Sequence, residues 1–172
     1  MLKEELQKAL NEQINAELFS SYLYLSMAAY FEDLGLAGFA SWMKVQAQEE
    51  LLHSGKFYTF INERRGRVQL LPIEGPQLEW ESPLAAFKAA FEHECYISER
   101  IHKLVSLARK HEDYPTENFL QWFVAEQVEE EATADGIVQR LKLIGDNSGG
   151  VFMLDRELGA RTFALPAAGA ED

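Results

Sequence analysis

The stretch Glu49-Glu50-Leu51-Leu52-His53 decides the fold, because it places a carboxylate and an imidazole inside a hydrophobic stripe. Glu50 and His53 are three residues apart, so on a helix they share one face, about 60° apart and about 4.5 Å along the axis. A carboxylate oxygen and an imidazole nitrogen placed in this way can bind one metal ion. The stripe advances in steps of four and three, typical of a helix face turned into a bundle, and consists of Phe39, Met43, Gln46, Glu50, His53, Phe57 and Phe60.

The composition indicates one globular domain with a core of its own. The chain has 172 residues, of which 47% are hydrophobic and 26% are charged. Its formal net charge of −12 argues against nucleic-acid binding and fits a cationic substrate, although solubility alone would also account for it. Cys95 is the only cysteine, so an internal disulfide is excluded and a reducing compartment, the cytoplasm, is expected. No apolar run reaches the ~18 residues that span a bilayer, so no membrane association is expected.

Four long helical patterns cover, in chain order, residues 3–34, 37–65, 83–110 and 117–144. Gly35 and Gly38 leave only a short link between the first two, which are therefore antiparallel. The segment 66–82 could extend over up to about 55 Å, more than the ~40 Å of a helix of about 27 residues. It can therefore carry the chain back along the bundle. The predicted fold class is all-α: a four-helix up-down-down-up bundle with a long crossover between helices two and three.

The C-terminal part of the chain predicts a fifth, short helix over residues 151–158. A lone helix of two turns is marginal in water, so this one must dock on the bundle or on another subunit. Residues 162–172 are rich in alanine and are expected to form a flexible tail, which leaves residues 1–161 as the folded domain.

One glutamate interrupts the apolar stripe of each long helix, and in chain order these are Glu17, Glu50, Glu94 and Glu130. Each lies near the midpoint of its helix, and a midpoint stays at the same height whichever way the helix points. The four carboxylates should therefore meet at one layer of the bundle, with His53 and Gln127 one turn away.

The energetics of this layer favour a metal site. An unpaired buried ion costs several kcal/mol, whereas a whole domain is stable by only about 5–15 kcal/mol. No lysine or arginine lies on the four stripes, so the carboxylates must either be protonated, with raised pKa values, or hold cations. Four negative charges balance two divalent cations, and oxygen-rich ligation with one imidazole suits iron or manganese. The alternative is that the stripes are misjudged by one residue and the glutamates are solvated.

Gln127 stands where a second Glu-x-x-His pair would have a histidine. An amide is a poorer ligand, so a second metal ion should be held more loosely, mainly by Glu94, Glu130 and a shared Glu50. This asymmetry favours a site through which metal passes over one that retains it.

These residues resemble those of the bacterial non-haem ferritins. The resemblance is carried by residues 15–17 (NAE), 48–53 (QEELLH) and 119–131 (FLQWFVAEQVEEE) together with Glu94, and it covers about residues 2–161. It implies a ferritin-like fold, a hollow cage of 24 identical subunits, and ferroxidase activity in which Fe(II) is oxidised by O2 or H2O2 and stored as a ferric mineral. A di-iron oxidase acting on an organic substrate, or a binding bundle without catalysis, is the remaining alternative.

The resemblance also implies roles for individual residues. Residues matching the ligands of the first iron are Glu17, Glu50 and His53, and those matching the second are Glu50, Glu94 and Glu130. Gln127 matches a residue near the site. A third iron site is matched by Glu49, Glu126, Glu129 and Glu130, three of which spacing alone would describe as a charged helix edge. Tyr24 and Trp122 match aromatic residues beside the site, where they could hydrogen-bond or supply an electron; core packing is the alternative.

Several absences narrow the family further. Leu52 replaces the methionine that binds haem in related proteins, so no haem is expected. There is no Cys-x-x-Cys pair, unlike rubrerythrins, and no lysine-rich N-terminal arm, unlike DNA-binding miniferritins. The histidines His93, His102 and His111 are expected on the surface.

Overall fold

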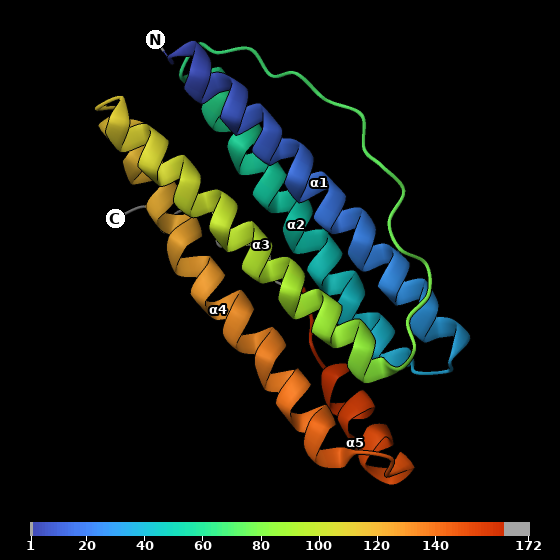
Figure 1. Cartoon of the computed structure of the whole chain (residues 1–172). Coiled ribbons are helices and arrows are strands. Elements are labelled where there is room, and N and C mark those ends of the chain that lie inside the picture. The colour runs from blue at the N-terminus through green and yellow to red at the C-terminus, as the bar shows by residue number, and fades with distance from the viewer. Residues whose placement is uncertain (1, 164–172) are drawn as a thin grey trace.

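The computed structural model describes residues 2–163, so the greater part of the predicted tail, residues 164–172, lies outside the described residues. The helices in this part of the chain are α1 (Glu4–Asp33), α2 (Ala37–Glu63), α3 (Pro83–Lys110), α4 (Tyr114–Ile144) and α5 (Ser148–Leu158). The helices α1 and α2 form one antiparallel pair, and α3 and α4 form another (Figure 1). The connection between the pairs returns along the bundle, so α2 and α3 run parallel and the predicted up-down-down-up fold is confirmed.

Polar side chains of α1 hold the crossover in place. Asn11 donates from Nδ2 to the carbonyl of Arg67 at 3.0 Å, and its Oδ1 accepts from the N–H of Gln69 at 2.7 Å. Near the other end of the crossover, Trp80 is buried with its ring 5.3 Å from that of Tyr30. The crossover therefore follows α1 because its backbone groups find partners there, which a segment without regular structure needs.

The starts of two helices differ from the prediction because capping residues extend them. The predicted start of the fourth helix at residue 117 is wrong: α4 begins at Tyr114, where Asp113 Oδ1 accepts from the N–H of Thr116 at 3.1 Å. Likewise α5 begins at Ser148 and not at residue 151, because the Asn147 side chain caps its first turn.

Asp113 also connects the start of α4 to the end of α2, and both lie at the same end of the bundle (Figure 1). Its carboxylate accepts two hydrogen bonds from the Arg64 guanidinium just beyond α2, at 2.8 and 3.0 Å. These bonds lower the pKa of Asp113 to about 2.

Helix α5 docks on the start of α2 through an unusually close backbone contact. Leu36, the N-cap of α2, offers no side-chain cap, and the carboxylate of Asp155 in α5 accepts from the N–H of Phe39 at 2.8 Å instead. A Cβ added to Gly38 would lie 1.7 Å from the carbonyl oxygen of Asp155, so only glycine fits there. The chain reversal itself uses Gly35, whose φ is +73°.

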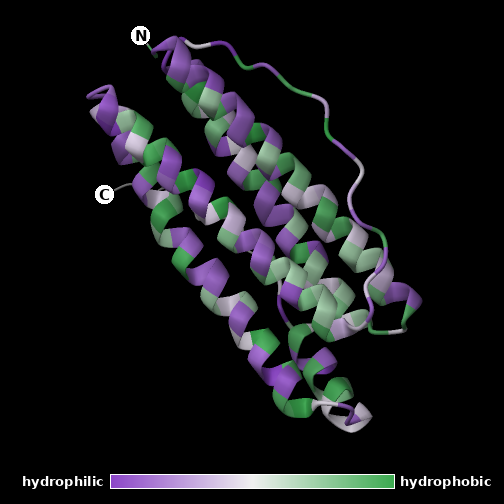
Figure 2. Ribbon diagram, in the orientation of Figure 1, coloured by the Kyte–Doolittle hydropathy of each residue, from purple (hydrophilic) through white to green (hydrophobic). Residues whose placement is uncertain are grey.

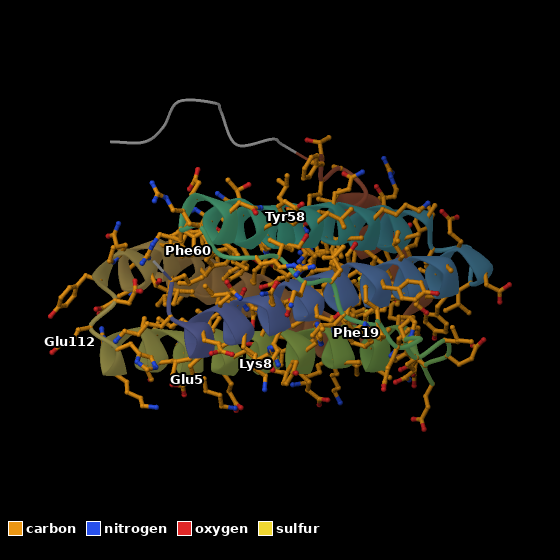
Figure 3. All side chains as sticks on the ribbon, turned by 90° about the horizontal axis from the view of Figure 1, so that it is seen from above. Glu5, Lys8, Phe19, Tyr58, Phe60 and Glu112 are labelled. Atoms are coloured by element: carbon orange, nitrogen blue, oxygen red, sulfur yellow. The ribbon has the colours of Figure 1, made fainter. Side chains whose placement is uncertain are left out.

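The core is divided into two apolar clusters along the length of the bundle. Hydrophobic and hydrophilic residues alternate along each long helix (Figure 2), and the hydrophobic ones are mostly the buried ones. Phe60 packs among the helices, whereas Glu5 and Lys8 of α1 are exposed (Figure 3). The first cluster, at the α5 end, includes Phe31, Phe39, Met43, Phe87 and Leu141. The second, at the opposite end, includes Leu6, Leu10, Phe57, Ile101 and Leu120. Among the described residues, none of the helices combines the length and apolarity that a membrane span needs.

Candidate metal centre

The four predicted glutamates lie where each long helix leaves one apolar cluster and enters the other. The exposed fractions of these residues are 1% for Glu17, 1% for Glu50, 1% for Glu94 and 7% for Glu130. The interpretation in which these glutamates face solvent is therefore wrong. The core contains a polar layer, and its carboxylates come from all four long helices.

Glu17, Glu50 and His53 form the compact part of this layer. One ligand atom from each residue lies within 4.8 Å of the other two. His53 Nδ1 lies 3.5 Å from Glu50 Oε2, yet within the described chain neither that oxygen nor Glu17 Oε2 has a hydrogen-bond partner. Buried carboxylate oxygens without donors are costly. Together with the imidazole nitrogen they provide the ligand atoms that a divalent cation requires.

Glu94 and Glu130 are held in the layer by neutral donors. The Tyr24 hydroxyl donates to Glu94, and Gln127 donates from Nε2 to Glu94 Oε2 at 3.2 Å. On the opposite side, Gln46 donates from Nε2 to Glu130 Oε2 at 2.8 Å. Tyr24 and Gln127 thus lie beside the site, as expected, and contact the layer through Glu94.

Burial raises the pKa values of the carboxyls in this layer. It raises the pKa of Glu17 to about 8, with a further contribution from the Glu50 carboxylate, and the pKa of Glu94 to about 7 with a contribution from Glu130. Burial and then repulsion by Glu94 raise the pKa of Glu50 well above its ordinary value. The metal-free layer therefore carries protons at neutral pH, and a divalent cation would displace them.

The residues predicted for a third site are arranged more loosely. Glu130 is buried, Glu49 and Glu126 are half-buried, and Glu129 is exposed. Burial raises the pKa of Glu126, and repulsion from Glu130 and Glu129 adds to it. The exposure of these residues thus increases from Glu130 through Glu49 and Glu126 to Glu129.

Trp122 does not pack in the core. Its side chain is 39% exposed, its ring lies 5.5 Å from that of His53, and Lys56 Nζ lies 4.1 Å from its ring centroid. The expectation that it lies beside the site agrees with these distances.

Two neighbours of the layer were not predicted from the sequence. Gln13 donates from Nε2 to Glu17 Oε1 at 2.8 Å. Because Gln13 lies four residues before Glu17, on the same face of α1, the spacing alone predicts that the two side chains can meet. Arg161, beyond α5, donates to Gln46 and to Glu49 Oε2, the latter at 2.6 Å. No arginine was expected beside the layer, because none lies on the four stripes. Arg161 reaches the layer from the segment after α5, outside those stripes.

The expectation that His93 lies on the surface is wrong in part, because this residue is half-buried. Its Nε2 lies 2.7 Å from Ser20 Oγ, and its ring packs edge-on to Tyr24 with 6.3 Å between centroids. Burial lowers its pKa to about 4, so the ring is neutral. His102 is exposed as expected, and His111 is partly buried.

The fold and this layer define a class of protein: a four-helix bundle with a carboxylate-and-histidine metal centre in its interior. The sequence model of the ferritin family, described as a ferritin-like domain, matches residues 7–144. The chain is 47% identical over 161 residues to a bacterial non-heme ferritin of Bacteroides fragilis, covering 94% of this chain and all of that protein. It is 39% identical over 163 residues to one of Staphylococcus aureus, covering 95% of this chain and 98% of that one.

Among solved structures, an open pore ferritin from Archaeoglobus fulgidus superposes with a TM-score of 0.94 at 54% identity, covering 94% of this chain and all of that chain. The chain belongs to the ferritin family and is an iron-storage protein with ferroxidase activity.

Proposed function

We propose that the buried layer is the ferroxidase centre and that it binds two Fe(II) ions as substrate. Glu17, Glu50 and His53 bind the first ion, and Glu94 and Glu130 bind the second together with a bridging Glu50. The observation that carries this assignment is the pair of buried, donor-free oxygens on Glu17 and Glu50 beside an imidazole nitrogen.

The electrons and protons balance in the following way. Each Fe(II) gives one electron; O2 takes two electrons and two protons to become H2O2, or H2O2 takes two of each to become two waters. The carboxyls of the layer lose protons when iron binds, so their full negative charge then favours the more highly charged Fe(III). Tyr24 and Gln127 hold Glu94 in place while the charge changes.

A third iron site is proposed at the carboxylates of graded exposure. Glu49, Glu126 and Glu129, with Glu130 shared, connect the buried centre with the surface of the subunit. Oxidised iron would leave through these residues, because each step outward exchanges a protein ligand for water.

Assembly into a 24-subunit cage is proposed from family membership and from the exposed apolar surface of the single subunit. The exposed large apolar side chains include Tyr22, Leu25, Leu70, Leu71, Ile73, Leu78, Phe152 and Met153. Those of the crossover and of α5 would be covered by neighbouring copies. The single cysteine and an oxidisable Fe(II) substrate favour the cytoplasm as the compartment.

The test is the initial rate of Fe(II) oxidation in Glu50→Ala and Glu130→Ala variants. Rapid oxidation should be abolished in both while circular dichroism shows an intact bundle. Glu63→Ala, which removes an exposed carboxylate from the same helix as Glu50, is the matched control and should oxidise iron at the wild-type rate. Unchanged rates in either layer variant would refute the assignment. Size-exclusion chromatography after iron loading separates a mineral-filled cage from a small oxidase.

A further inference from the structure

An arginine, a glutamine and a glutamate are joined in series at the edge of the layer. Arg161 Nη1 donates to Gln46 Oε1, and Gln46 Nε2 donates to Glu130 Oε2 at 2.8 Å. The side chain of Gln46 is fully buried, whereas Arg161 is half-buried. The guanidinium also donates from Nη2 to Glu49 Oε2 at 2.6 Å, and it lies 5.0 Å from the ring centroid of Trp42.

The same series occurs on the other side of the layer. Arg100 Nε donates to Gln13 Oε1 at 2.9 Å, and Gln13 Nε2 donates to Glu17 Oε1 at 2.8 Å. Gln13, like Gln46, has no exposed surface. Arg100 comes from α3 and Arg161 from the segment after α5, so the two series do not come from one local motif.

The arginine fixes which way the amide points. A guanidinium only donates hydrogen bonds, so it binds the amide oxygen and leaves the NH2 group for the carboxylate. Without the arginine, the buried oxygen of the Gln46 amide would lose its donor, and the amide could rotate away from Glu130 to find another. The orientation of Glu130 thus depends on Arg161 through Gln46.

The docking of α5 brings Arg161 to this position. Asp155 accepts from the N–H of Phe39, and the Gly38 backbone admits α5 at close range, so the chain leaves α5 beside the start of α2. Gln46 and Glu49 lie two to three turns further along that helix. The docking of α5 therefore places Arg161 next to the layer, although no residue of α5 itself lies in the layer.

We propose that Arg161 is a positioning residue of the ferroxidase centre. Through Gln46 it sets the orientation of Glu130, and through its second nitrogen it holds Glu49 away from the layer until iron reaches that carboxylate. This inference rests on the proposed function, because it takes Glu130 as a ligand.

The experiment compares Arg161→Met, Arg161→Lys and Gln46→Leu with the wild type, and uses Arg156→Met as control. Arg156 is exposed on α5, so its loss changes the net charge equally. The kcat and KM for Fe(II) oxidation are measured for each protein. Anaerobic titration with Co(II), followed by visible absorption, reports coordination without turnover. Melting of the metal-free proteins and size-exclusion chromatography verify that each variant folds and assembles.

Arg161→Met should lower kcat about tenfold, the lower end of what the loss of an outer hydrogen-bond partner costs at a metal site. Its KM should not rise, because removing the positive charge of Arg161 does not weaken the attraction of the site for Fe(II). Arg161→Lys should keep the wild-type KM but share the low kcat, since an ammonium does not reproduce the planar fork that joins Gln46 to Glu49. Gln46→Leu should also lower kcat, and both Arg161→Met and Gln46→Leu should change the Co(II) absorption band.

Wild-type kcat in Arg161→Lys, a raised KM with unchanged kcat in Arg161→Met, or an unchanged Co(II) band would each overturn the proposal. A low kcat in Arg156→Met would overturn it too, since charge alone would then suffice. If Arg161→Met does not assemble, Gln46→Leu decides the question with the arginine still present. Failure of the ferroxidase assignment itself is recognised separately, because Glu50→Ala would then oxidise iron at the wild-type rate.

Discussion

Replacing Glu17 with glutamine should stabilise the metal-free protein, and by a larger amount as the pH rises. Glu17 is 1% exposed; its Oε1 accepts from Gln13 at 2.8 Å, and its Oε2 has no donor among the described residues. A glutamine has the same shape. Its oxygen can keep the bond from Gln13, and its NH2 group can donate to the Glu50 carboxylate, with which the Glu17 carboxyl is hydrogen-bonded while it is protonated. The substitution makes permanent, at every pH, the neutral hydrogen-bond-donating state that Glu17 keeps only while it is protonated.

The magnitude follows from the pKa of Glu17, which burial raises from 4.5 to about 8. Between these two values the folded protein binds more protons than the unfolded chain, so the free energy of unfolding falls as the pH rises. At ~1.4 kcal/mol per unit, the loss between pH 5 and pH 8 is about 3 kcal/mol. Glutamine does not titrate, so the variant avoids this loss. At ~2–4 °C per kcal/mol, its advantage in melting temperature should grow by about 6–12 °C over that interval.

The assay is thermal unfolding of chelator-treated protein, followed by circular dichroism at several pH values from 5 to 8. Glu63→Gln, at an exposed position of α2, is the control, and its curve should run parallel to that of the wild type. A constant difference between Glu17→Gln and wild type across this range would refute the reasoning, as would a variant less stable than wild type at pH 8. With Fe(II) added anaerobically, the order should reverse because the variant has lost a ligand.

Three further perturbations test other parts of the structure. Tyr24→Phe removes the hydroxyl that donates to Glu94; the bundle should fold normally, while stopped-flow kinetics should show a slower initial oxidation of iron. A wild-type rate would mean that Glu94 needs no such donor. Gly38→Ala places a methyl group where the Asp155 carbonyl oxygen lies 1.7 Å away, so hydrogen exchange should show α5 losing protection well before the other helices. Asp113→Asn keeps a capping side chain but loses the ion pair to the arginine after α2, and should destabilise the protein by about 1–2 kcal/mol at pH 7 after allowance for solvent screening. Because the pKa of Asp113 is lowered from 3.8 to about 2, that difference should shrink to a small fraction as the pH falls from about 4 to about 2. Urea titrations that show it undiminished at pH 2 would contradict the ion-pair account.

Local capping signals explain the two helix starts that were misplaced. The residues Asp113 to Thr116 contain an N-cap and a proline in the first turn, yet the sequence was interpreted there as a turn between helices. The Asn147 cap of α5 is a signal of the same kind. Such signals can be identified in the sequence, but they compete with turn-forming tendencies of the same residue types.

His93 shows the opposite case, in which no local pattern was available. It lies one residue from Glu94 and off the core stripe of α3, so periodicity places it at the surface. It is half-buried because α1 passes close enough for Ser20 to contact the ring, and this depends on how the two helices approach each other.

The sequence by itself determined the four long helices, the crossover and the layer of glutamates. Helical periodicity is a local property, and a glutamate at the midpoint of every helix lies at the same height in any antiparallel or parallel arrangement. Only the tertiary structure decided which side chains hold those glutamates. Arg161 and Gln46 are separated by 115 positions in the chain, and no periodic pattern connects residues that far apart; the docking of α5 brings them together.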